Sequence, residues 1–192
     1  MRRLCGCVSL VSGLVLCLCG CTPTAVPTFP LPTLTAAIQF VVDHAADFAE
    51  PDGLSGGDVA DAAALDGCWA RVADASNVEL PYVGAQDVQV YDVYRFDAAV
   101  GTARSELLMQ NADVNVLVIR SGTFEVTEPG LATIRMTEYE QSNPFTGAIE
   151  PVTGVESSET EVHAEIDGER LILTRTTGDS PRPFTYTRFD CP

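Results

Sequence analysis

Beyond residue 66, apolar and polar residues alternate in runs that are separated by turn-forming residues. This alternation is typical of strands that bury one face. It predicts eight strands, over residues 68–73, 87–97, 103–110, 114–127, 131–141, 157–166, 169–177 and 183–191. The connections are short, and Asp167-Gly168 has the composition of a two-residue hairpin turn. Short connections require antiparallel neighbours.

The fold class predicted from this pattern is mainly β. Eight sequential antiparallel strands favour an up-and-down barrel over residues 66–192, because closure removes the exposed edges of a sheet. A two-sheet sandwich is the alternative. No internal repeat is evident in the sequence.

Residues 34–65 have a helical pattern. Helical spacing of apolar residues predicts a helix over 34–50, with Thr33 or Thr35 as its N-cap. A second, short helix is expected over residues 59–65, with Asp58 as its N-cap. We expect this helical segment to close one end of the barrel or to pack against its side.

The first 20 residues have the layout of a secretory signal: Arg2 and Arg3 precede an apolar run that is too short to prefer a membrane span. The run ends in Leu18-Cys19-Gly20-Cys21, which resembles the lipobox of bacterial lipoproteins. The resemblance implies that Cys21 is acylated and becomes the first residue of the mature protein. An ordinary signal peptide that is rich in cysteine is the alternative. The Pro- and Thr-rich residues 21–33 would then be an extended tether.

The lipobox resemblance also implies a location and a partner. The chain would be anchored in the bacterial cell envelope, with the membrane as partner through the lipid on Cys21. The residue after Cys21 is Thr22 and not Asp. In a Gram-negative cell this favours the outer membrane, with the protein facing the periplasm.

Seven cysteines suggest a disulfide-rich protein, but four of them lie within residues 1–20 and Cys21 would carry the lipid. Only Cys68 and Cys191 remain. Two cysteines in an exported protein predict one disulfide, which would join the start of the barrel to its end. A redox-active or metal-binding pair is the alternative.

Gly67-Cys68-Trp69 opens the first predicted strand, and Arg188 lies in the last one. This arrangement resembles the lipocalins and the wider calycin group, above all the bacterial lipocalin-like lipoproteins. The resemblance implies that Arg188 packs across the ring of Trp69, where a guanidinium contributes about 0.5–2 kcal/mol. The sequence departs from that pattern in having no helix after the last strand. Trp69 as an ordinary core residue is the alternative.

The composition excludes several classes of function. The chain has 27 acidic residues against 11 arginines, for a net charge of -16, which argues against binding nucleic acid. It contains no lysine, only His44 and His163 as imidazoles, and none of the common catalytic motifs. We therefore expect no catalytic activity and no cofactor.

One strand carries Glu159, Glu161, His163 and Glu165 on a single face. The arrangement is typical of a solvated outer face, and a divalent-cation site is the alternative. We predict no metal site.

Charges on otherwise apolar faces are more informative. Asp92 shares a face with Tyr94 and Phe96, and Arg120 lies among valines of another strand. In a barrel these four residues would face the lumen, where Asp92 and Arg120 could pair with each other or orient the polar head of a ligand. The sequence thus favours a carrier of a small apolar or amphipathic molecule. The alternative is an envelope protein, an inhibitor or an assembly factor, that binds a protein partner through its acidic outer surface.

Overall fold

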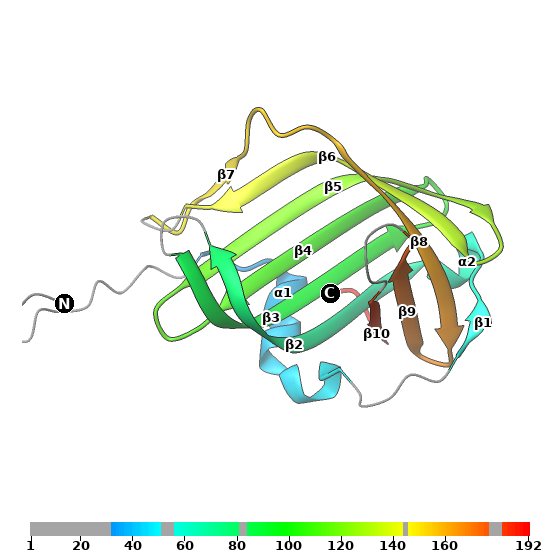
Figure 1. Cartoon of the computed structure of the whole chain (residues 1–192), viewed down its shortest axis with the longest axis horizontal. Helices are drawn as coiled ribbons and strands as arrows, with labels where there is room; N and C mark the ends of the chain where they lie inside the picture. The colour runs from blue at the N-terminus through cyan, green and yellow to red at the C-terminus, as the bar shows by residue number, and fades with distance from the viewer. Residues whose placement is uncertain (1–31, 51–55, 81–83, 144–145, 177–181) are drawn as a thin grey trace, which may run out of the picture.

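The computed structural model describes residues 32–50, 56–80, 84–143, 146–176 and 182–192 (Figure 1). Its elements, in chain order, are helix α1 Ala36–Asp43, 3-10 helix η1 Ala45–Phe48, β1 Asp58–Val59, α2 Ala62–Leu65, β2 Gly67–Leu80, β3 Gly84–Asp97, β4 Thr102–Gln110, β5 Asn115–Glu128, β6 Leu131–Ser142, β7 Ile149–Pro151, β8 Ser158–Asp167, β9 Arg170–Arg175 and β10 Pro183–Phe189. Within these residues, no helix has the length and apolar character needed to cross a membrane.

The strands form a closed antiparallel barrel. Eight of them follow one another in the order β8-β9-β10-β2-β3-β4-β5-β6, and β6 pairs with β8 to complete the ring. Each of the eight predicted strands corresponds to one of these, so the barrel is confirmed over the two-sheet sandwich. Two short strands add to it: β1 pairs with β8, and β7 pairs with β6.

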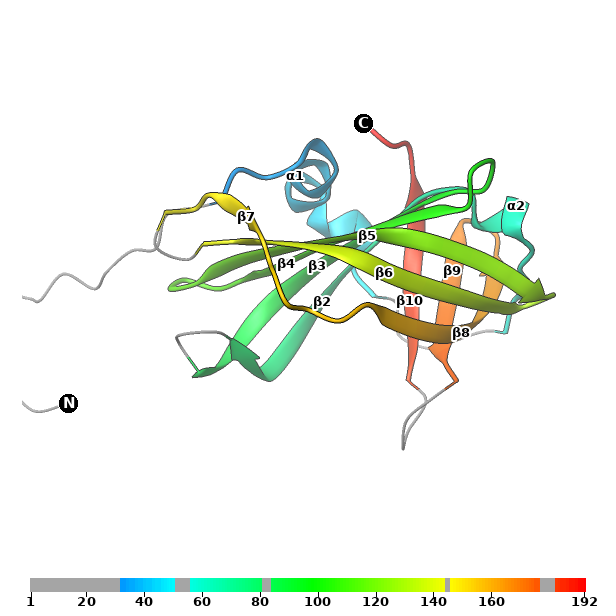
Figure 2. The same cartoon turned by 90° about the horizontal axis from the view of Figure 1, so that it is seen from above.

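The barrel wall is uneven in height. Strands β2 to β6 form a long curved sheet, whereas β8 and the shorter β9 and β10 cover only one end of its inner face (Figure 2). Strand β10 is paired with β2 only from Thr187 to Phe189. Further along β2, the edge at Val72 is paired instead with Ala49, in a parallel bridge. The other end of the long sheet therefore projects beyond the closed part of the barrel.

Two cores lie on opposite faces of this sheet. Inside the closed end, Trp69, Phe96, Phe124 and Leu171 pack together and are buried. On the outer face, α1 covers β2 to β5 with its own apolar side. Figure 2 shows α1 on one side of the sheet and β8 to β10 on the other.

The helical segment differs in detail from the prediction. The first helix is shorter than the predicted 34–50, and a separate 3-10 turn follows it. Its N-cap is Thr35, which is one of the two predicted candidates. The Thr35 side chain accepts a hydrogen bond from the amide of Ile38. The second helix begins at Ala62 and is capped by Asp61. The predicted cap Asp58 was wrong, because residues 58–59 pair with β8 as a strand.

Strand β2 extends well past the predicted end at residue 73. Its second half contains a register shift between Ala75 and Val78, and Asn77 there has a φ of 57°. A β-bulge of this kind interrupts the alternation on which the prediction depended. Together with β3, this half of β2 forms the hairpin that curls at the projecting end (Figure 1).

Candidate ligand-binding site

The inner face of the barrel carries a band of polar side chains. Asp92, Tyr94 and Phe96 alternate along β3, and Arg120 lies on β5, where its Cα partner on β4 is Ser105. Ser105 is in turn the Cα partner of Tyr94. The four predicted residues therefore share the inner face. Phe96 belongs to the packed closed end, where its ring centroid is 5.0 Å from that of Phe124.

Asp92 is buried and has two partners. Its Oδ2 accepts hydrogen bonds from Arg71 Nε at 3.3 Å and from the Tyr186 hydroxyl at 2.9 Å. Arg71 also lies 3.7 Å from a carboxylate oxygen of Glu50, and its guanidinium carbon is 4.4 Å from the ring centroid of Phe184. The other oxygen of Asp92, Oδ1, is buried and has no hydrogen-bond partner among the described residues.

Arg120 does not pair with Asp92, so this alternative of the prediction was wrong. Its Nη2 donates to Ser105 Oγ at 2.8 Å. Its Nε is buried and without a partner in the described part of the chain. The pairing failed because Arg71, the Cα partner of Asp92 on β2, is nearer to that carboxylate.

The sequence reasoning missed Arg71 and Tyr186. A signal for both was present, since Arg71 is two residues after Trp69 and Tyr186 is two residues before Arg188. Alternation places each of them on the same inner face as its neighbour in the Trp–Arg pair. The contact of Asp92 with Arg71 lies within the β2–β3 pair, whereas its contact with Tyr186 depends on barrel closure, which places β10 beside β2.

Two tyrosines of the polar band are held in their neutral form. Burial raises the pKa of Tyr186 well above its ordinary value, and the charge of Asp92 adds to this effect. Burial and then Asp92 also raise the pKa of Tyr94, whereas Arg120 opposes the shift. Asp92 and Arg120 thus both act electrostatically on the Tyr94 hydroxyl. Both hydroxyls can donate hydrogen bonds at neutral pH.

Beyond the polar band, the inner face of the projecting sheet is apolar. Leu80, Val88, Val114 and Val116 are buried against one another under the curled hairpin. Between them and the polar band lies a set of half-buried apolar side chains: Val90, Leu107, Met109 and Val118. The band and this apolar wall together form a surface with a polar and an apolar end.

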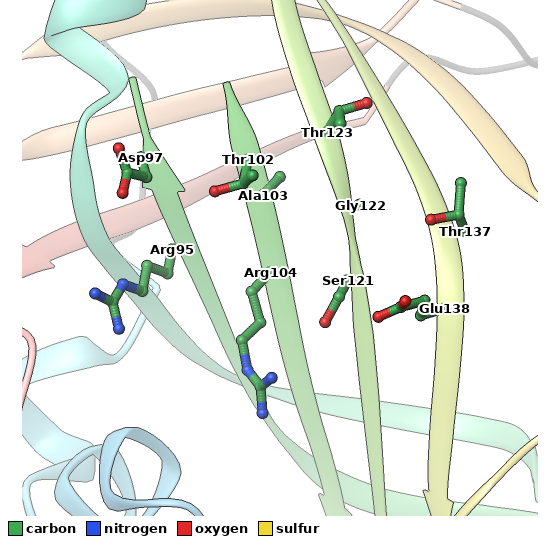
Figure 3. Close-up of a pocket in the computed structure, with 10 residues that line it drawn as sticks. All are labelled: Arg95, Asp97, Thr102, Ala103, Arg104, Ser121, Gly122, Thr123, Thr137 and Glu138. Atoms are coloured by element: carbon green, nitrogen blue, oxygen red, sulfur yellow. The ribbon is translucent and has the colours of Figure 1, made fainter. Parts of the chain in front are cut away.

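A separate pocket of about 470 Å³ lies on the outer face of β3 to β6 (Figure 3). Small residues, among them Ala103 and Gly122, form its floor. Its rim is polar and includes Arg95 and Arg104, which are Cα partners on β3 and β4. Arg104 Nε donates to Glu106 Oε1 at 2.7 Å. This pocket does not communicate with the predicted site residues, which lie on the other face of the sheet.

The predicted contact of Trp69 with Arg188 is present. The guanidinium carbon of Arg188 is 5.3 Å from the ring centroid, and Arg188 Nη2 donates to the carbonyl of Asp66 at 3.0 Å. Gly67 has a φ of 116°, and a Cβ at this position would be 3.4 Å from Arg188 Nη2. Glycine is therefore favoured there by its conformation and by the nearby arginine.

The predicted disulfide is also present. Cys68 and Cys191 are joined, with their Cα atoms 5.5 Å apart and 123 positions apart in the sequence. Cys68 is the Cα partner of Phe189, so the bond lies beside the contact of β2 with β10. The disulfide and the Trp69–Arg188 pair thus fasten the same short seam.

The acidic strand has its expected alternation. Glu159 is exposed and pairs with Arg135 at 2.5 Å, and His163 Nδ1 is 3.6 Å from Glu165 Oε1. Glu161 Oε1 accepts a hydrogen bond from the Thr176 hydroxyl. The opposite face of the strand carries buried Val162 and Ala164. In the described residues, no group of three or more candidate ligands is arranged to hold a metal ion.

Three predictions concern residues outside the described part of the structure. These are the signal peptide over residues 1–20, lipidation of Cys21, and the tether, of which only Pro32 and Thr33 are described. They stay predictions.

No protein-family model matches this chain, and no curated protein is similar to it in sequence. The class is therefore defined by the fold alone, a closed eight-stranded antiparallel barrel of the lipocalin-like type.

Proposed function

We propose that this protein is a lipid-anchored carrier of the bacterial cell envelope, which binds a small amphipathic molecule on the inner face of its barrel. The observation that carries the proposal is the apolar wall formed by Val90, Leu107, Met109 and Val118, which is half-buried and adjoins a polar band. Half-buried apolar side chains beside a few convergent polar groups are typical of sites for small molecules.

The uneven height of the barrel supports this proposal. The strands β8 to β10 do not extend along the whole of the long sheet, so part of its inner face is not covered by strands (Figure 2). The closed end is filled by Trp69, Phe96 and Phe124, which leaves the projecting end for a ligand. Eight-stranded barrels have an interior that is either filled by side chains or able to hold one small ligand.

The proposed location depends on the N-terminal sequence. The lipobox-like Leu18-Cys19-Gly20-Cys21 would give a diacylated cysteine, and two acyl chains anchor a protein far more firmly than one. Residues 21–33 would separate the barrel from the membrane surface. Intact-mass analysis of the envelope protein, with and without inhibition of the lipoprotein signal peptidase, tests this part. Absence of a lipid-sized mass increment on Cys21 would exclude the anchor.

The carrier function is tested by native mass spectrometry of the protein purified from its own envelope, followed by organic extraction. We expect a stoichiometric small molecule, and we expect Leu107→Asp to abolish it because a charge in the apolar wall repels an apolar tail. The matched control is Val100→Asp, since Val100 is 68% exposed in the turn between β3 and β4. Loss of the molecule in both variants, or its absence from the parent protein, would contradict the proposal.

The outer pocket favours a second candidate function, the binding of a protein partner. Its polar rim carries Arg95 and Arg104 beside Asp97 and Glu138, so it is less acidic than the chain as a whole. Crosslinking in the envelope from a photoreactive residue at Ser121, which lines the pocket, tests this candidate. A single crosslinked protein that is lost in Arg95→Glu would favour the binding of a protein partner. Absence of any crosslinked protein would exclude this candidate and leave the carrier function as the only one.

A further inference from the structure

The polar band has an uneven distribution of charge. Arg71 faces two carboxylates, because Asp92 Oδ2 is 3.3 Å from its Nε and Glu50 Oε2 is 3.7 Å from its Nη1. In contrast, no carboxylate among the described residues lies within ion-pair distance of Arg120. The charge of Arg71 is therefore compensated by its two carboxylate partners. Arg120, which is bound in the described part of the chain only by the Ser105 hydroxyl, carries the uncompensated positive charge of the band.

The hydrogen bonds of Arg120 are also incomplete. One donor, Nη2, is bound by Ser105 Oγ at 2.8 Å. Nε is buried and has no partner among the described residues. Buried donors on a charged group are costly to leave unpaired. A carboxylate or a phosphate accepts from Nε and a neighbouring Nη at the same time, which no neutral acceptor does as well.

Neighbouring hydroxyls would assist an anion at this place. Tyr94 lies next to Ser105 across β3 and β4, and its phenol hydroxyl is protonated at neutral pH and able to donate. Asp92 does not oppose an anion strongly, because Arg71 and Tyr186 both bind its carboxylate. Arg120, Ser105 and Tyr94 thus provide donors without a nearby uncompensated negative charge.

The apolar wall continues from this point along the same strands. On β5, Val118 is two residues from Arg120 and shares its face, and on β4 Leu107 and Met109 follow Ser105 in the same way. A head group at Arg120 would therefore lie at one end of an apolar surface. The distance from Arg120 to the buried Val116 along β5 is about 13 Å, from the rise of a strand.

We propose that the inner face binds an amphipathic anion with a single apolar tail, whose carboxylate- or phosphate-type head lies on Arg120 and whose tail covers Val90, Leu107, Met109 and Val118. This inference rests on the proposed carrier function and names its class of ligand. A neutral amphiphile would leave Arg120 without a counter-ion, and a cationic one would meet the uncompensated charge of Arg120.

The test is isothermal titration of the full chain carrying Cys21→Ser, which removes the proposed lipidation site so that no detergent is needed. The probes are decanoate, decanol and decyltrimethylammonium, below the concentrations at which they form micelles. We expect decanoate to bind at least about 10-fold more tightly than decanol, and decyltrimethylammonium to bind weakest. Arg120→Gln should weaken decanoate about 10- to 100-fold, the effect of losing a hydrogen-bonded charge partner, and leave decanol unchanged.

Two variants keep the result specific. Arg120→Lys keeps the charge but loses the two-pronged hydrogen bonding, so it should recover only part of the affinity for decanoate. Arg135→Gln removes an exposed arginine on the outer face and should change nothing. If decanoate and decanol bind equally and Arg120→Gln affects neither, the anionic head is excluded while the carrier function stands. If none of the three probes binds, the carrier function itself fails.

Discussion

Arg188 lies across the indole ring of Trp69, and the two residues are Cα partners on β10 and β2. The ring is fully buried, and its Nε1 donates to the carbonyl of Leu65 at 2.8 Å. The arginine is held from its other side by the carbonyl of Asp66. The pair thus joins the last strand of the barrel to the first, and both to the chain that enters from α2.

This contact predicts a coupling between Trp69→Phe and Arg188→Ala. Because Arg188 is exposed, the cation–π contribution should be in the lower range, about 0.5–1 kcal/mol. The double variant should therefore be less destabilised than the sum of the single variants by about that amount. Urea unfolding of the four proteins measures the coupling.

The control for this cycle is Arg170→Ala, which removes an exposed arginine from β9. Its effect should add to that of Trp69→Phe without coupling. Strict additivity of Trp69→Phe and Arg188→Ala would instead mean that the arginine contributes nothing through the ring.

Alternation along the chain, in runs separated by turn residues, was sufficient to predict the barrel, although α1 also buries part of the outer face of β2 to β5. It failed where a tertiary contact replaces the local pattern. Val59 precedes the short run of apolar residues that predicted a helix over residues 59–65. In the structure, however, Val59 lies in a strand and is the Cα partner of Glu165. Three-residue β7 is too short to carry an alternating pattern at all.

The candidate site was predicted in part for the same reason. Residues on one strand, such as Asp92 and Tyr94, share a face by their spacing alone. Which charges meet depends on the register of neighbouring strands and, for Tyr186 on β10, on closure of the barrel. Asp92 therefore meets Arg71 and Tyr186 where the sequence suggested Arg120.

The disulfide should make a large contribution to stability. It closes a loop with a sequence separation of 123, and the loss of chain entropy in the unfolded state corresponds to roughly 4–5 kcal/mol for a loop of that length. We expect the double variant Cys68→Ala, Cys191→Ala to be destabilised by about this amount in urea unfolding. Reduction of the parent protein is the matched comparison, and a loss below about 1 kcal/mol in both would contradict the expectation.

Asp92→Asn should destabilise the protein by about 3 kcal/mol, the lower end for breaking a buried ion pair, because Glu50 remains near Arg71. Removal of both charges in Asp92→Asn, Arg71→Met should recover part of the loss, since no unpaired buried charge then remains. Thermal unfolding at neutral pH gives both values. A double variant that is less stable than either single variant would show that the pair is not the cause.

Alkaline pH should destabilise the protein through Tyr94 and Tyr186. Their pKa values are raised in the folded state, so the folded protein holds these protons more tightly than the unfolded chain. The resulting stability is fully present below the ordinary tyrosine pKa of about 10 and is lost as the pH rises above it. At pH values above about 10, the urea concentration at the midpoint of unfolding should therefore decrease with rising pH. This decrease should be less steep in Tyr94→Phe and in Tyr186→Phe. An equal slope in the parent and both variants would contradict this assignment.

The bulge between β5 and β6 depends on a glycine. A Cβ at Gly122 would lie 1.9 Å from the carbonyl oxygen of Arg135 on the neighbouring strand, and the register shifts between Ser121 and Gly122. The obstacle is backbone, so no side chain can rotate away, and the two strands would have to separate. Gly122→Ala should cost at least about 2 kcal/mol in urea unfolding. Gly56→Ala is the matched control, since a Cβ there meets nothing within 4 Å. Similar small losses in both variants would mean that the bulge adapts, and that the close approach of β5 and β6 is not a constraint on the fold.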